Sequence, residues 1–171
     1  MKRKLLMLGV ASLLVGATQL MAQAKPSFAG SWTLVPDPAA AADAGGARRG
    51  GGGGGFGGLG NAATIAQDAS TLTITRTTQA GETKSVYKLD GSESKNTMAG
   101  RNGAAGTETT STAKWDANKL VISTNVNFNG TAITTSMSLS LDASGQLIVE
   151  SSGFGRGGAA PTPTKTTYKK G

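Results

Sequence analysis

Cysteine and histidine are both missing from this sequence of 171 residues. Without cysteine the chain can form no disulfide and can carry no lipid on an N-terminal cysteine. Without imidazole or thiolate side chains it lacks the usual general base, the usual sulfur nucleophile and the common zinc and copper ligand sets. These absences exclude most hydrolase and redox mechanisms. We therefore predict a protein that is not an enzyme and that uses no metal or cofactor.

Long apolar runs are almost absent as well. The clearest one, Leu5 to Val15, is too short to span a bilayer, follows three basic residues at 2–4 and precedes small residues at 22–24. A basic start, a short apolar stretch and a small-residue cleavage site are typical of a secretory signal peptide. We expect residues 1–24 to be removed, and the exported chain to begin at Lys25, in the periplasm or outside the cell, without a transmembrane segment.

Charge is scarce too. The net charge is +7, and it falls to +4 once the three basic residues of the signal peptide are removed. An excess of this size favours contact with an anionic envelope surface, but solubility alone also explains it. Arg-Gly segments such as those near 48 and 156 bind RNA in other proteins. Because export separates the chain from that partner, we expect no nucleic acid to be bound.

Glycine, in contrast, is abundant. Eleven of the sixteen residues from 45 to 60 are glycine. Glycine at this density loses so much backbone entropy on ordering that we predict a flexible, disordered loop there.

The rest of residues 25–171 alternates polar and apolar side chains with a period of two, and turn residues recur every eight to twelve positions. This pattern predicts one all-β domain of 8–9 antiparallel strands, with the Gly-rich loop after the first strand. Nearly every connection is too short to cross over, which favours an up-and-down barrel over a Greek key. Asp90-Gly91 predicts a type I′ hairpin. A transmembrane barrel is the competing fold, disfavoured by an aromatic content of only 5%.

Residues Phe28-Ala29-Gly30-Ser31-Trp32, at the start of this meander, resemble the G-x-W signature of lipocalins. The resemblance implies a barrel that holds a small apolar ligand. It also implies a basic residue near the last strand against the tryptophan, here Lys165 or Lys169. The wider pattern, which adds Lys114-Trp115-Asp116 and Leu139-Ser140-Leu141-Asp142, resembles small secreted bacterial β-proteins and implies β structure and export.

Two sets of side chains are candidates for binding. Strand aromatics either fill the core or line a ligand cavity, and the ligand-binding candidates are Trp32, Tyr87, Trp115 and Phe128. Side chains on Gly-rich segments are candidates for contact with a partner. These are Arg48, Arg49, Phe56, Phe154 and Arg156, and we also expect Leu59 to be an exposed apolar tip.

The primary hypothesis is an exported, non-catalytic, lipocalin-like protein that binds a small apolar or amphipathic ligand. The alternative is an envelope or extracellular interaction protein with a solid barrel, whose Gly-rich loops form the contact surface. An enzyme is a third class, because carboxylates can support glycoside hydrolysis, but strand spacing does not establish their separation. The carboxylates concerned are Asp90, Glu93, Glu108 and Glu150. Asp116-Ala117-Asn118 opens like a calcium loop, yet the later ligands are missing and it predicts a turn.

Overall fold

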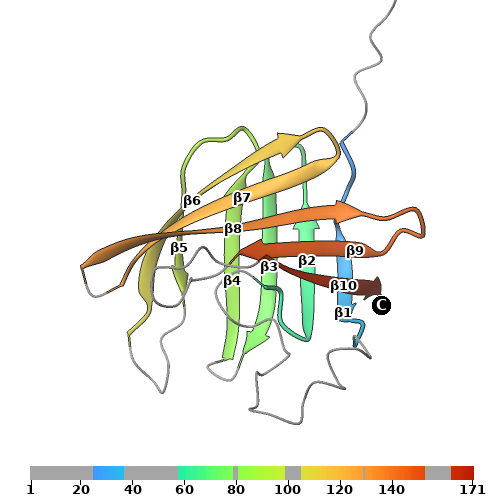
Figure 1. The fold of residues 1–171 in the computed structure, drawn as a ribbon, viewed down its shortest axis with the longest axis horizontal. Coiled ribbons are helices and arrows are strands. Elements are labelled where there is room, and N and C mark those ends of the chain that lie inside the picture. The colour runs from blue at the N-terminus through green and yellow to red at the C-terminus, as the bar shows by residue number, and fades with distance from the viewer. Residues whose placement is uncertain (1–24, 37–57, 79–80, 99–104, 129, 153–162) are drawn as a thin grey trace, which may run out of the picture.

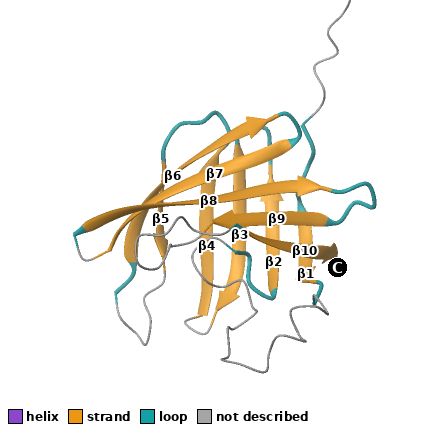
Figure 2. Cartoon of the chain, in the orientation of Figure 1, coloured by secondary structure: helices purple, strands orange, loops and turns teal. Residues whose placement is uncertain are grey.

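The computed structural model describes residues 25–36, 58–78, 81–98, 105–128, 130–152 and 163–171 (Figure 1). All regular secondary structure in these ranges is β (Figure 2). The strands are β1 (Gly30–Leu34), β2 (Ala62–Gln67), β3 (Thr71–Thr78), β4 (Gly81–Lys88), β5 (Ser94–Met98), β6 (Thr107–Asp116), β7 (Lys119–Phe128), β8 (Thr131–Leu141), β9 (Leu147–Ser152) and β10 (Thr164–Lys170). Within the same ranges, no helix has the length and apolar character needed to cross a membrane.

The ten strands form one antiparallel sheet with the order β4-β3-β2-β1-β10-β9-β8-β7-β6-β5. The first and last strands pair, with Trp32 opposite Lys170, so the meander rolls into a nearly closed barrel. This confirms the predicted all-β antiparallel meander. There are ten strands rather than eight or nine, because β2 (sequence AATIAQ) also forms a strand. Its single large apolar residue, Ile65, gives a weak signal in the sequence.

Figure 1 shows two crossed layers, with β1 to β4 running up and down the view and β7 to β10 running across it. Among the described strands, neighbours around the barrel lack a backbone ladder only at the seam between the two edge strands, β4 and β5. Side chains bridge that seam. The Asn96 amide accepts a hydrogen bond from Val86 N at 2.7 Å and donates one to Val86 O at 3.0 Å, and Ser94 Oγ accepts one from Lys88 N at 2.9 Å.

Alternation along each strand separates the two faces of the sheet. On β8, Thr135, Met137 and Leu139 are buried and face inward. The residues between them, Ser136 and Ser138, face outward and bond Ser152 and Glu150 on the next strand. The outer face of β8 is therefore rich in hydroxyl side chains.

At one end of the barrel, which we call the Asp-turn end, three of the short turns between strands are stabilised by an aspartate. Asp68, Asp90 and Asp142 each accept hydrogen bonds from the backbone N–H and the hydroxyl of the residue two positions later. These bonds stabilise the ionised carboxylates and lower the pKa of all three. At Asp90-Gly91 only the glycine has positive φ, +84°. The predicted type I′ hairpin is therefore wrong, because that turn requires positive φ at both residues, and the Asp90 carboxylate instead accepts hydrogen bonds from Ser92.

The connections at the opposite end are β1–β2, β3–β4, β5–β6, β7–β8 and β9–β10. Most of the predicted flexible loop, residues 45–57, lies outside the described residues. Residues 58–60 are described, and there Leu59 is fully buried instead of being an exposed tip.

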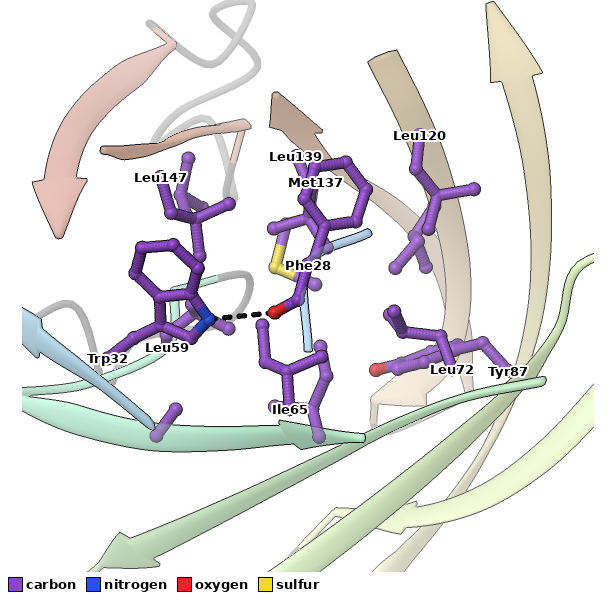
Figure 3. Packing of buried hydrophobic residues seen from close by; sticks show 14 of the residues in the cluster. Phe28, Trp32, Leu59, Ile65, Leu72, Tyr87, Leu120, Met137, Leu139 and Leu147 are labelled. Atoms are coloured by element: carbon purple, nitrogen blue, oxygen red, sulfur yellow. Dashed lines mark hydrogen bonds between the residues drawn. The ribbon is translucent and has the colours of Figure 1, made fainter. Parts of the chain in front are cut away.

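Residues 25–29, before the first strand, pack against the Asp-turn end of the barrel. Phe28 is fully buried and stacks on Trp115, with ring centroids 5.7 Å apart. Its backbone N–H donates to Gln67 Oε1 at 2.8 Å, and its carbonyl accepts the indole N–H of Trp32 at 2.8 Å (Figure 3). The chain entering β1 therefore closes this end of the barrel.

Candidate functional site

The inner wall of the barrel has an apolar part, which we call the apolar cluster. Its buried side chains come from both crossed layers of the sheet and pack around Phe28, Trp32 and Leu59 (Figure 3). The members are Phe28, Trp32, Leu59, Ala63, Ile65, Leu72, Ile74, Tyr87, Leu89, Ala113, Leu120, Ile122, Met137, Leu139, Leu147, Val149 and Tyr168.

A second part of the wall carries small hydroxyl side chains. This hydroxyl row begins on β4, beside Arg76 and Ile74 of β3, and continues over β5 and β6 to β7 and β8. Some of its hydroxyls bond one another or nearby carbonyls: Ser111 and Thr124 lie 2.8 Å apart, and Thr109 Oγ1 donates to Asn96 O at 3.2 Å. The members are Thr83, Ser85, Ser94, Thr109, Ser111, Thr124 and Thr135.

Three apolar side chains accompany the hydroxyl row without joining the apolar cluster. Val126 is only 3% exposed, yet it lies outside the cluster. Its cross-strand partners are Thr109 on β6 and Ile133 on β8. Ile133 and Met98 are partly exposed and are also not packed against the cluster. These three side chains therefore accompany the hydroxyl row and are not members of the apolar cluster.

Arg76 projects from the inner face of β3, next to Ala63 on β2 and Thr83 on β4. Of the described strand residues, Arg76 and Lys170 are the two charged ones at inward-facing positions, and both are cationic. Arg76 Nη1 donates to Gly58 O at 2.7 Å, whereas the buried Nε has no hydrogen-bond partner among the described residues. A buried guanidinium nitrogen without an acceptor is costly. This side chain was not among the sequence candidates.

Tyr168 on β10 holds the same segment that Arg76 contacts. Its ring is fully buried, and its hydroxyl donates to Gly60 O at 3.0 Å. Burial raises the pKa of Tyr168, and the positive charge of Arg76 offsets part of that rise. Two inner-wall side chains therefore bind the backbone on either side of Leu59.

The structure places three of the predicted ligand-binding aromatics on the inner wall. Trp32 and Tyr87 belong to the apolar cluster, and the partly buried Trp115 packs against it. Phe128 lies in β7 opposite Thr131, but its side chain is outside the described part. The aromatics contribute packing, and their predicted contact with a ligand stays a prediction.

A lysine does lie over the Trp32 ring, but it is Lys170 rather than Lys165 or Lys169. Its Nζ is 5.9 Å from the ring centroid. The β1–β10 register pairs Trp32 with Lys170 and Thr33 with Lys169, so Lys169 faces outward. Sequence alone did not fix this register.

The predicted partner-binding residues lie outside the described ranges. They are Arg48, Arg49, Phe56, Phe154 and Arg156. Their role as a contact surface stays a prediction.

The candidate carboxylates do not form a common site. Glu108 is exposed on β6 and pairs with Lys95 at 3.4 Å, whereas Glu150 lies on β9 and pairs with Lys119 at 2.8 Å. Strands β7 and β8 separate the two. The Lys119 ammonium lowers the pKa of Glu150. Asp90 and Glu93 lie in and next to the β4–β5 turn, and the described residues contain no cluster of three or more metal-ligating side chains.

A shallow depression of about 390 Å³ lies on the outside of the Asp-turn end. Its lining includes Pro26, Ala117 and Leu141. It brings together none of the predicted binding residues. The inner wall remains the better candidate, since it combines a partly buried cation, hydroxyls and apolar groups.

No protein-family model matches this chain, and no curated protein matches its sequence. The site is therefore defined by its geometry.

Arg76 did carry a signal in the sequence: in Leu72-Thr73-Ile74-Thr75-Arg76, strict alternation places the arginine on the same face as the two apolar residues. A charged side chain on the apolar face of a strand is unusual and indicates a special role.

Proposed function

We propose that this protein is exported, is not an enzyme, and binds a small apolar or amphipathic molecule against the inner wall of its barrel. The observation that carries the proposal is Val126, which is buried on the inner wall but separate from the apolar cluster. A barrel filled by its own side chains has interior residues that pack in continuous layers. Small hydroxyls beside apolar groups that lie outside the apolar cluster are a lining that suits a ligand site. The signal-peptide pattern in residues 1–24 supports export.

The first test is native mass spectrometry of the processed protein purified from its own host. A retained small molecule of defined mass is expected, and its identity would give the ligand class. Saturable binding of the uncharged dye N-phenylnaphthylamine, followed by fluorescence, is the matching test on ligand-free protein. Absence of both a retained molecule and saturable dye binding would overturn the proposal.

Two matched variants locate the binding. Val126→Phe adds bulk on the inner wall, whereas Asn127→Phe adds the same ring at the neighbouring, exposed position on the outer face. We expect the first to weaken dye binding about tenfold or more and the second to leave it unchanged. Circular dichroism confirms folding of both. Deleting residues 45–57 should preserve dye binding, and loss of binding there would favour the Gly-rich loop as the contact surface.

A further inference from the structure

The segment Gly58–Gly60 fits the inner wall as an amphipathic ligand would. Leu59 is fully buried in the apolar cluster. The carbonyl oxygens on either side of it accept hydrogen bonds from inner-wall side chains, Gly58 O from Arg76 and Gly60 O from Tyr168. The segment thus presents one carbonyl oxygen to the Arg76 cation, a second to the Tyr168 hydroxyl, and an apolar group to the core of the wall.

The carbonyl of Gly58 satisfies only part of Arg76. It occupies Nη1, while Nε is buried and unpaired among the described residues. No aspartate or glutamate occupies an inward-facing position of the described strands, so no carboxylate of these strands faces the guanidinium. An arginine side chain binds a carboxylate through two parallel N–H groups, and a neutral carbonyl is a weaker partner. Among the described strands, the wall therefore offers Arg76 no anionic partner.

We propose that Arg76 is the head-group site for an amphiphile with a carboxylate, and that the segment Gly58–Gly60 occupies this site until the ligand displaces it. The inference rests on the proposed function and names the chemistry of its ligand. The carboxylate binds the guanidinium at Nε. The alkyl chain takes the position of Leu59 against the apolar cluster and extends toward the apolar groups of the hydroxyl row.

The test compares decanoate with decanol, which share a chain length and differ in the head group. Each competes with N-phenylnaphthylamine for the full processed protein at neutral pH. We expect decanoate to bind about tenfold or more tightly than decanol, because only the carboxylate pairs with Arg76. Arg76→Met should bring the two affinities together. Lys170→Met, which removes the other inward-facing cation, should keep the preference.

The outcomes separate the two proposals. If both compounds bind with equal affinity, the head-group inference is wrong while barrel binding stands. If neither compound nor the dye binds, both fail. Should Arg76→Met not fold, the wild-type ratio of decanoate to decanol decides, with Arg76→Lys as the variant that keeps charge but loses the planar fork.

A substitution at Leu59 tests whether the ligand displaces the segment Gly58–Gly60. Leu59→Ala removes most of the apolar group that the ligand must replace, so we expect decanoate to bind several-fold more tightly to this variant. Glu93→Ala, an exposed substitution at the distant β4–β5 turn, is the control and should change nothing. Weaker binding by Leu59→Ala would show that Leu59 lines the ligand site rather than occupying it, and would overturn the displacement.

Discussion

Trp32 donates its indole N–H to the carbonyl oxygen of Phe28, four residues earlier, at 2.8 Å in a buried position. The bond turns the chain before β1 back onto the barrel and fixes the Phe28 ring against Trp115. Gln67 reinforces the same turn, since it accepts from Phe28 N and donates to Pro26 O at 3.2 Å. The tryptophan of the G-x-W pattern therefore holds the chain before β1 against the barrel.

Trp32→Phe tests how much the indole hydrogen bond contributes to stability. The substitution retains an aromatic ring but leaves the buried Phe28 carbonyl without a partner, which typically costs about 1–3 kcal/mol. We expect a lower midpoint in urea unfolding with an unchanged slope. Trp115→Phe is the control, because its partly buried indole N–H bonds no residue that the structure describes. Equal losses in the two variants would mean that ring volume, and not the hydrogen bond, stabilises the turn.

Tyr168→Phe should lower stability in a pH-dependent way. The variant leaves Gly60 O unpartnered, so at neutral pH we expect a loss of about 1–3 kcal/mol. In the wild type, burial raises the pKa of Tyr168 above its usual value of 10.0. The unfolded chain then ionises first, and the stability of the wild type falls as pH rises above about 10. Phenylalanine does not ionise.

Urea unfolding at neutral pH and near pH 11 gives the free energy of unfolding of the wild type and of Tyr168→Phe. The difference between these two free energies should be smaller at the higher pH. A difference that stays constant or becomes larger would show that ionisation of Tyr168 is not coupled to unfolding.

Asp68→Asn should reduce stability at neutral pH and have less effect in acid. The Asp68 carboxylate accepts hydrogen bonds from Ser70 and Thr71, and these lower its pKa. A lowered folded pKa gives stability that is present above about pH 4 and is lost as pH falls below it. Chemical unfolding at neutral pH and near pH 2 checks this. Glu93→Gln is the control, and a stability difference for Asp68→Asn that does not depend on pH would contradict the prediction.

Alternation and turn spacing were enough to predict the meander, because one buried face imposes a period of two on each strand. They missed β2, whose small side chains Ala63 and Ala66 hardly mark a face. The lipocalin resemblance implied Lys165 or Lys169 over Trp32, whereas the β1–β10 register pairs Trp32 with Lys170 and turns Lys169 outward. Register depends on the partner strand, which the local sequence does not contain.

The candidate site was harder to predict than the fold. Glycines around Leu59 indicated a free loop, since composition reflects the entropy cost of ordering a segment and not the hydrogen bonds and burial that offset it. Those hydrogen bonds come from Arg76 and Tyr168, which are 18 and 108 residues from their acceptors Gly58 and Gly60. The aromatic candidates Trp32, Tyr87 and Trp115 do lie on the inner wall, because they follow the same alternation as the core.

Asn96→Ala should open the seam between β4 and β5. The Asn96 side chain bonds both backbone groups of Val86, as a neighbouring strand would. Removing it exposes the Val86 amide, and we expect hydrogen exchange at this amide to become about tenfold faster or more. Thr97→Ala, at the next and outward-facing position, is the control and should leave the exchange rate unchanged.

Asn96→Asp separates the two bonds of this bridge. The carboxylate still accepts from Val86 N, so that amide should remain protected, while Val86 O loses its donor. We therefore expect slow exchange together with a lower unfolding midpoint, measured by amide exchange and urea titration on the same sample. Fast exchange at Val86 in this variant would show that the amide as a unit, and not its acceptor oxygen, holds β4 against β5.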